Sequence, residues 1–136
     1  MQKISLSSKK APAATGPFSQ AIIASNKYRL ELSGQIGLDP EKGELVEGGL
    51  TAQTERTFEN IKGVLSEVGW DFDNIIKVRV YLTDMGNYAE LNEIYSKKFG
   101  EKAPARVVVA VKELPLKALV EIECLAEGDE ISEIAK

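Results

Sequence analysis

The 136-residue sequence contains no histidine and a single cysteine. Histidine is the commonest general base near neutral pH and the commonest metal ligand in proteins. Its absence excludes a Ser-His-Asp or Cys-His catalytic device, and a Cys/His zinc site, within one chain. Any catalysis must therefore use carboxylates, Arg, Lys, Tyr, hydroxyl groups, backbone amides or bound water.

Long apolar runs are also absent. No stretch approaches the ~20 residues that span a bilayer, and the opening MQKISLSSKK lacks the apolar segment of a secretory signal. Cys124 has no second cysteine with which to form a disulfide within the chain. The net charge of -4 argues against unaided nucleic-acid binding, which usually needs a basic face. These features predict a cytoplasmic protein that does not associate with membranes, and they disfavour a nucleic-acid partner.

The hydrophobic pattern predicts one α+β domain over residues 1–136. Gly69 suits the end of a first helix, and Asn87 with Glu90 has the spacing of a capping box at the start of a second. Both helices are expected to cover one face of a single sheet. Strands are expected at residues 4–6, 18–24, 28–34 and 75–82 and twice within 104–126, and helices at 51–68 and 87–99.

The last two predicted strands, in PARVVVAVKELPLKALVEIECLA (104–126), contain charged residues among apolar ones. We expect them to pair as a hairpin, with the face of Val107 and Val109 under the helices and Arg106 on the opposite, mixed face. Glu121 is expected on the mixed face of the partner strand, about 13 Å from Arg106 along the sheet. The charges would then bracket a small ligand or meet a neighbouring subunit; alternatively, they are the solvated face of a sheet.

Three other features narrow the candidate site. Pro104 fixes the backbone where Arg106 enters its strand, and a fixed guanidinium matches the two oxygens of a carboxylate. Asn92, on the second predicted helix, is either a buried hydrogen-bonding residue or a surface residue. Cys124 falls on an apolar face and is predicted to be a packed thiol, not a nucleophile.

Five segments in this order resemble the reactive intermediate deaminase family, also called the YjgF or RidA proteins. The resemblance runs from about Ala11 to Ala126, and its specificity comes from the ordered series. The segments are APAATGPFSQA (11–21), LSGQIGLDPEKGELVEGG (32–49), AQTERTFENIKGVL (52–65), VRVYLTDMGNYAELNEIYSKKF (78–99) and PARVVVAVKELPLKALVEIECLA (104–126).

The resemblance implies a chorismate-mutase-like α+β fold with a mixed sheet, and a homotrimer with ligand clefts between subunits. It also implies hydrolysis of 2-imino acids, such as 2-iminopropanoate and 2-iminobutanoate, to 2-oxo acids and ammonia. An imine protonated at nitrogen is already electrophilic, so the reaction needs orientation, a placed water and proton transfers. No metal ion or organic cofactor is required.

The resemblance also assigns roles to individual residues. Arg106 would hold the substrate carboxylate, and Gly34 and Val108 would offer backbone contacts. Ser33 and Glu121 would line the cleft. Our hypothesis is that Glu121 orients the water or carries a proton to the departing ammonia.

Two positions depart from the family pattern. Phe18 stands where relatives commonly have tyrosine, and Val108 stands where many bacterial relatives have cysteine, while Asn92 matches a recurrent asparagine. Phe18 lacks the hydroxyl of that tyrosine, which puts in doubt any mechanism that needs a hydroxyl at this position. Two other functions stay open: a non-catalytic, regulatory binder of small carboxylates, and an endoribonuclease or translation inhibitor.

Overall fold

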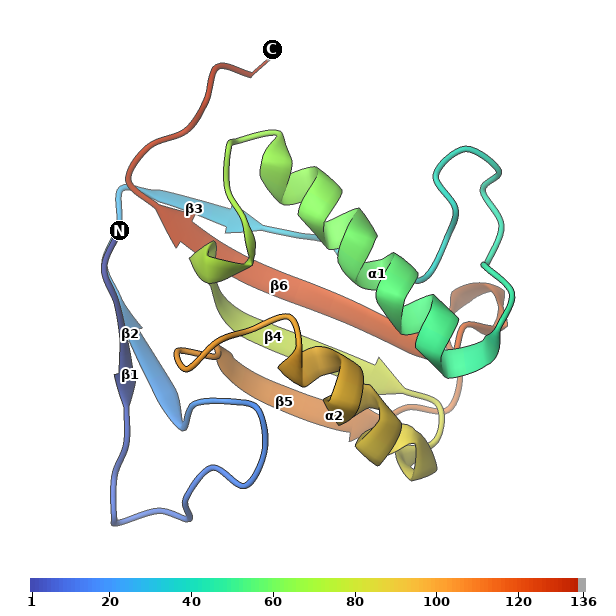
Figure 1. Ribbon diagram of the computed structural model, residues 1–136, viewed down its shortest axis with the longest axis horizontal. Coiled ribbons are helices and arrows are strands. Elements are labelled where there is room, and N and C mark those ends of the chain that lie inside the picture. Colours follow the sequence, from blue (N-terminus) through green and yellow to red (C-terminus); the bar gives the residue numbers. More distant parts are fainter. Residues whose placement is uncertain (135–136) are drawn as a thin grey trace.

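Two helices pack on one face of a mixed sheet in the computed structural model, which describes residues 1–134 (Figure 1). The predicted α+β fold and the predicted order of strands and helices are confirmed. The elements are β1 (Lys3–Leu6), β2 (Ala21–Ala24), β3 (Tyr28–Glu31), α1 (Gly49–Ser66), β4 (Ile75–Leu82), α2 (Tyr88–Ser96), β5 (Ala105–Ala110) and β6 (Val120–Gly128), with 3-10 helices at Phe72–Asn74, Met85–Asn87 and Pro115–Lys117.

The main sheet has four strands in the order β3-β6-β4-β5. Strand β6 is antiparallel to β3 and β4, whereas β5 runs parallel to β4. The predicted hairpin is therefore wrong, because β4 lies between β5 and β6. A parallel neighbour needs a crossover connection, and α2 supplies it between β4 and β5.

The predicted single sheet is also divided. Strands β1 and β2 form a separate antiparallel pair, seen at the lower left of Figure 1. An isolated bridge between Ser19 and Ala105 links the chain just before β2 to the start of β5. The loop that precedes β2 is thereby held against the edge strand of the main sheet.

The core lies between the helices and the main sheet. Phe58, Ile61 and Leu65 of α1 follow helical spacing and are completely buried. They meet Val80 of β4 and Ile122 of β6, which are also completely buried. An aromatic cluster continues this core toward α2, and consists of Phe58, Phe72, Tyr95 and Phe99.

The two helix ends differ in how well they were predicted. Gly69 has a positive φ of 78°, and the Trp70 amide donates to the Leu65 carbonyl at 3.0 Å, so the predicted role of this glycine after α1 is confirmed. The capping box at Asn87 is wrong, because its side chain makes no capping hydrogen bond. A 3-10 turn directly precedes α2, and Asp84 accepts from the backbone amide of that turn instead.

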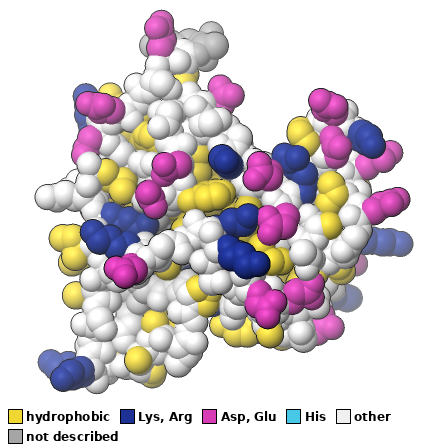
Figure 2. Space-filling model, viewed as in Figure 1, with side chains coloured by type: hydrophobic (Ala, Val, Ile, Leu, Met, Phe, Trp, Pro, Cys, Tyr) yellow, Lys and Arg dark blue, Asp and Glu magenta, His cyan; other side chains and the backbone are white. Residues whose placement is uncertain are grey.

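Acidic and basic side chains are interspersed on the face that carries the helices (Figure 2). Within residues 1–134, no helix combines the length and the apolar character needed to cross a membrane.

Candidate functional site

Arg106 lies on the helix-covered side of β5, which corrects the predicted orientation of this strand. Its Nη1 donates to Asn92 Oδ1 at 2.7 Å, and its Nη2 donates to the Tyr88 hydroxyl at 3.1 Å; both partners are on α2. The valines predicted to lie under the helices face the other way, and Val107 and Val109 are each 40% exposed. Val108, on the side of Arg106, is half-buried against the core.

A charged group can occupy this side because of what surrounds it. The guanidinium carbon lies 4.7 Å from the ring centre of Tyr95, 5.1 Å from that of Phe18 and 5.7 Å from that of Tyr88. Aromatic faces attract a guanidinium, and the two hydrogen bonds replace part of its hydration. We call Phe18, Tyr88, Asn92, Tyr95 and Arg106 the arginine cluster.

The charge of the arginine cluster is not neutralised by a carboxylate of the same chain. Burial lowers the pKa of Arg106, but a guanidinium stays protonated at neutral pH. Within residues 1–134, no Asp or Glu forms an ion pair with it. Asn92 and Tyr88 are neutral acceptors and leave the net positive charge in place. The cluster is therefore suited to bind an anion with two oxygens.

Ser33, Gly34 and Glu121 form a second group, which we call the glutamate cluster. A Cβ atom on Gly34 would lie 2.5 Å from Glu121 Oε2, so the Glu121 carboxylate would have to move if another residue stood at position 34. Paired hydrogen bonds between Gln35 and Ile122, at 2.8 and 2.9 Å, hold the chain after Gly34 beside β6. Ser33 and Gly34 are exposed and Glu121 is half-buried.

The two clusters lie on opposite faces of the sheet. Arg106 shares a row with Val78 and Cys124, whose side chains face the helices, whereas Glu121 pairs with Tyr81 three positions further along on the open face. The separation is about 10 Å along the strands and about 10 Å across them. Arg106 and Glu121 do not form an ion pair, because β4 lies between their strands and their side chains point to opposite faces.

Sequence reasoning missed both Tyr88 and Tyr95 as contacts of Arg106. The sequence could have indicated these contacts, because positions 88, 92 and 95 fall on the same face of a helix as one another. Asn92 is half-buried and hydrogen-bonded, which decides between its two predicted roles. Glu123, which had no predicted role, accepts a short hydrogen bond from the Tyr81 hydroxyl, and this bond raises the pKa of Tyr81.

The predicted character of Cys124 is confirmed. The side chain is buried, and burial raises the pKa of its thiol to about 12, so little thiolate forms at neutral pH. Within residues 1–134, no group of three or more His, Cys, Asp or Glu side chains is placed to hold a metal ion.

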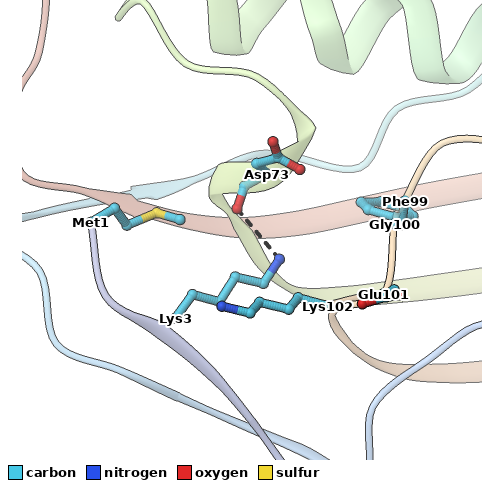
Figure 3. Close-up of a pocket in the computed structure, with 7 residues that line it drawn as sticks. All are labelled: Met1, Lys3, Asp73, Phe99, Gly100, Glu101 and Lys102. Atoms are coloured by element: carbon cyan, nitrogen blue, oxygen red, sulfur yellow. Dashed lines mark hydrogen bonds between the residues drawn. The ribbon is translucent and has the colours of Figure 1, made fainter.

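A separate cavity of about 390 Å³ lies beside β1 and contains none of the predicted site residues. Lys3 reaches toward the Asp73 carbonyl, 3.4 Å from its Nζ, with Lys102 drawn beside it (Figure 3). Lys3 is only 9% exposed, and desolvation lowers its pKa. The full lining is Met1, Lys3, Asp73, Phe99, Gly100, Glu101 and Lys102, which has charges of both signs.

Replacing Lys3 with methionine is expected to raise the free energy of unfolding at pH 7 by about 1 kcal/mol, because the change removes a poorly compensated buried charge. The lowered pKa means that the unfolded wild type binds more protons than the folded one, so its stability rises as pH increases toward 10.5. The advantage of Lys3→Met should therefore shrink in urea denaturation at pH 10. A variant that is less stable than wild type at both pH values would contradict this account.

Comparisons with known proteins agree with the fold. The model of the family described as Endoribonuclease L-PSP matches residues 8–128. A RutC family protein of Pyrococcus abyssi is 46% identical over 126 residues, covering 93% of this chain and 98% of that protein. The 2-iminobutanoate/2-iminopropanoate deaminase of Mus musculus is 41% identical over 121 residues, covering 89% of this chain and 88% of that protein. A crystal structure of a Rid family protein of Yersinia pestis matches with a TM-score of 0.83 at 27% identity, over 93% of this chain and 98% of that one.

Proposed function

The chain belongs to the YjgF/RidA family, whose model is described as Endoribonuclease L-PSP, and we propose that it hydrolyses 2-imino acids to 2-oxo acids and ammonia. The observation that carries the proposal is the arginine cluster. It presents a half-buried guanidinium with neutral hydrogen-bond partners and no carboxylate counter-ion within residues 1–134. A 2-imino acid offers the carboxylate that this group lacks. We propose 2-iminobutanoate and 2-iminopropanoate as the substrates.

We further propose that the cleft forms in a homotrimer, where the arginine cluster of one protomer faces the glutamate cluster of the next. The two clusters lie on opposite faces of one sheet, so within one chain they cannot contact the same ligand. A contact between two different surfaces of the same chain is head-to-tail, and such contacts close into a ring when the rotation between neighbouring protomers permits it. The exposed Val107 and Val109 give the open face of β5 an apolar surface that a neighbouring protomer would cover.

In the proposed reaction, Arg106 binds the carboxylate through its two remaining η N–H groups, and backbone groups of Gly34 and Val108 orient the imine. A water oxygen bonds to C2 as the C=N π electrons move to nitrogen and the water loses a proton. Glu121 takes that proton and returns it to the nitrogen. Ser33 lines the side of the cleft that carries Glu121. The C–N bond then breaks and ammonia departs, while the Glu121 carboxylate accepts the hydroxyl proton as the C=O bond forms.

The test is ammonia release from freshly generated 2-iminobutanoate, compared with the uncatalysed hydrolysis in the same buffer. Acceleration by wild type supports the deaminase. Binding of 2-oxobutanoate without acceleration would instead favour a regulatory binder of small carboxylates. RNA cleavage that survives Arg106→Ala and repurification would favour the endoribonuclease of the family description.

A further inference from the structure

We infer that the Tyr88 hydroxyl is a substrate-positioning group, which donates a second hydrogen bond to the carboxylate held by Arg106. The inference rests on the proposed function, because it concerns the same cleft. It adds a residue that neither composition nor motif had singled out, at the first position of α2.

The hydrogen bonds of Arg106 show which of its donors are occupied. A guanidinium has five N–H donors, one on Nε and two on each η nitrogen. Asn92 takes one from Nη1 and Tyr88 takes one from Nη2, and no further acceptor bonds to it within residues 1–134. Each η nitrogen therefore keeps one N–H. One free N–H on each η nitrogen is the number of donors that the two oxygens of a carboxylate require.

The direction of the Tyr88 proton follows from the same contact. In the 3.1 Å bond the guanidinium can only donate, so the phenol oxygen accepts and its own proton points elsewhere. That proton has no acceptor among residues 1–134, and the side chain is half-buried, so it remains accessible. An anion that bridges the η nitrogens would lie next to this O–H. The adjacent positive charge also strengthens the phenol as a donor.

The other rings of the cluster do not offer such a hydroxyl. Phe18 lies 5.1 Å from the guanidinium carbon and has none. Tyr95 is nearer, at 4.7 Å, but it is completely buried and its hydroxyl finds no partner within the described chain, so it serves as a packing surface. A Cβ atom on Gly16 would lie 3.2 Å from the Phe18 ring and 3.3 Å from Arg106 Nη2, so this loop packs tightly on the guanidinium. Because the Phe18 ring centre lies 5.1 Å from the guanidinium carbon, we expect a hydroxyl added to this ring to reach an anion bound by Arg106.

The experiment compares Tyr88→Phe with the exchanged variant Phe18→Tyr/Tyr88→Phe. Losing a hydrogen bond to a charged group lowers affinity by about ten- to a hundredfold. We therefore expect Tyr88→Phe to lower kcat/KM for 2-iminobutanoate about tenfold, mainly through KM, and to weaken binding of 2-oxobutanoate about tenfold in calorimetry. The exchanged variant should recover to within about threefold of wild type. Tyr28→Phe, which removes a hydroxyl on β3, should match wild type in both measurements.

The outcomes separate this inference from the proposed function. If Tyr88→Phe equals wild type in both measurements while Arg106→Ala is inactive, the inference is overturned and the function stands. If wild type does not accelerate imine hydrolysis but Tyr88→Phe still weakens 2-oxobutanoate binding, the function fails and the positioning role stands. Recovery in the exchanged variant is the decisive sign, because a purely structural role for Tyr88 would not be restored by a hydroxyl at position 18.

Discussion

Arg106→Ala is expected to lower kcat/KM for 2-iminobutanoate by at least about a hundredfold, the loss that corresponds to removing a charged, two-point contact with the substrate carboxylate. Alanine removes the guanidinium donors and leaves Asn92 Oδ1, which can only accept hydrogen bonds, facing the substrate carboxylate. The Tyr88 hydroxyl alone cannot replace a charged, two-point contact. The measurement is steady-state ammonia release at several substrate concentrations. Binding of 2-oxobutanoate should be lost in parallel.

Two variants control for charge and for general damage at Arg106. Arg106→Lys keeps the charge but not the fork, so its activity should lie between those of Arg106→Ala and wild type. Arg29→Ala removes an exposed arginine of β3 that lies opposite Glu127, six positions along β6 from Glu121, and should stay within about twofold of wild type. Undiminished activity in Arg106→Ala would mean that the anion is bound elsewhere.

Phe58→Ala should have the largest effect on stability, about 3–5 kcal/mol of the free energy of unfolding. Phe58 is completely buried, and its ring meets those of Phe72 at 5.8 Å, Tyr95 at 5.9 Å and Phe99 at 6.2 Å, mostly edge to face. Alanine would leave a cavity at the centre of this cluster. Because Tyr95 also stacks on Arg106, the cavity should loosen the site as well.

Urea denaturation at one fixed protomer concentration measures the effect, because the apparent stability of an oligomer depends on concentration. Phe58→Leu keeps most of the volume and should cost clearly less than Phe58→Ala. A loss below about 1 kcal/mol in Phe58→Ala would show that the aromatic cluster is not the central part of the core.

Local periodicity was enough to predict the helices and most of the strands. Helix α1 follows from the spacing of Phe58, Ile61 and Leu65, and β4 follows from strict alternation. Strand pairing was not predictable in this way, because a parallel neighbour is chosen through long-range packing. The segment 104–126 looked like a hairpin, and only the structure places β4 between its two strands.

The orientation of β5 shows why the candidate site was predicted only in part. Both faces of this strand are rich in apolar residues, and the face with more valines was assigned to the core. The structure turns Arg106 inward, because aromatic rings and Asn92 of α2 accommodate it there. The sequence thus identified most of the candidate site residues. Their distribution over the two faces of the sheet, and the contact of Arg106 with Tyr88, depend on three-dimensional packing. Local sequence patterns do not determine that packing.

The most direct test of the shared cleft uses two variants that we expect to be inactive alone, Arg106→Ala and Glu121→Gln. They are mixed in equal amounts, unfolded and refolded together. If each site combines Arg106 of one protomer with Glu121 of the next, about one quarter of the sites in randomly mixed trimers have both wild-type residues. We predict that the mixture recovers about one quarter of wild-type ammonia release from 2-iminobutanoate. Activity no greater than that of the separate variants would contradict a site formed between subunits.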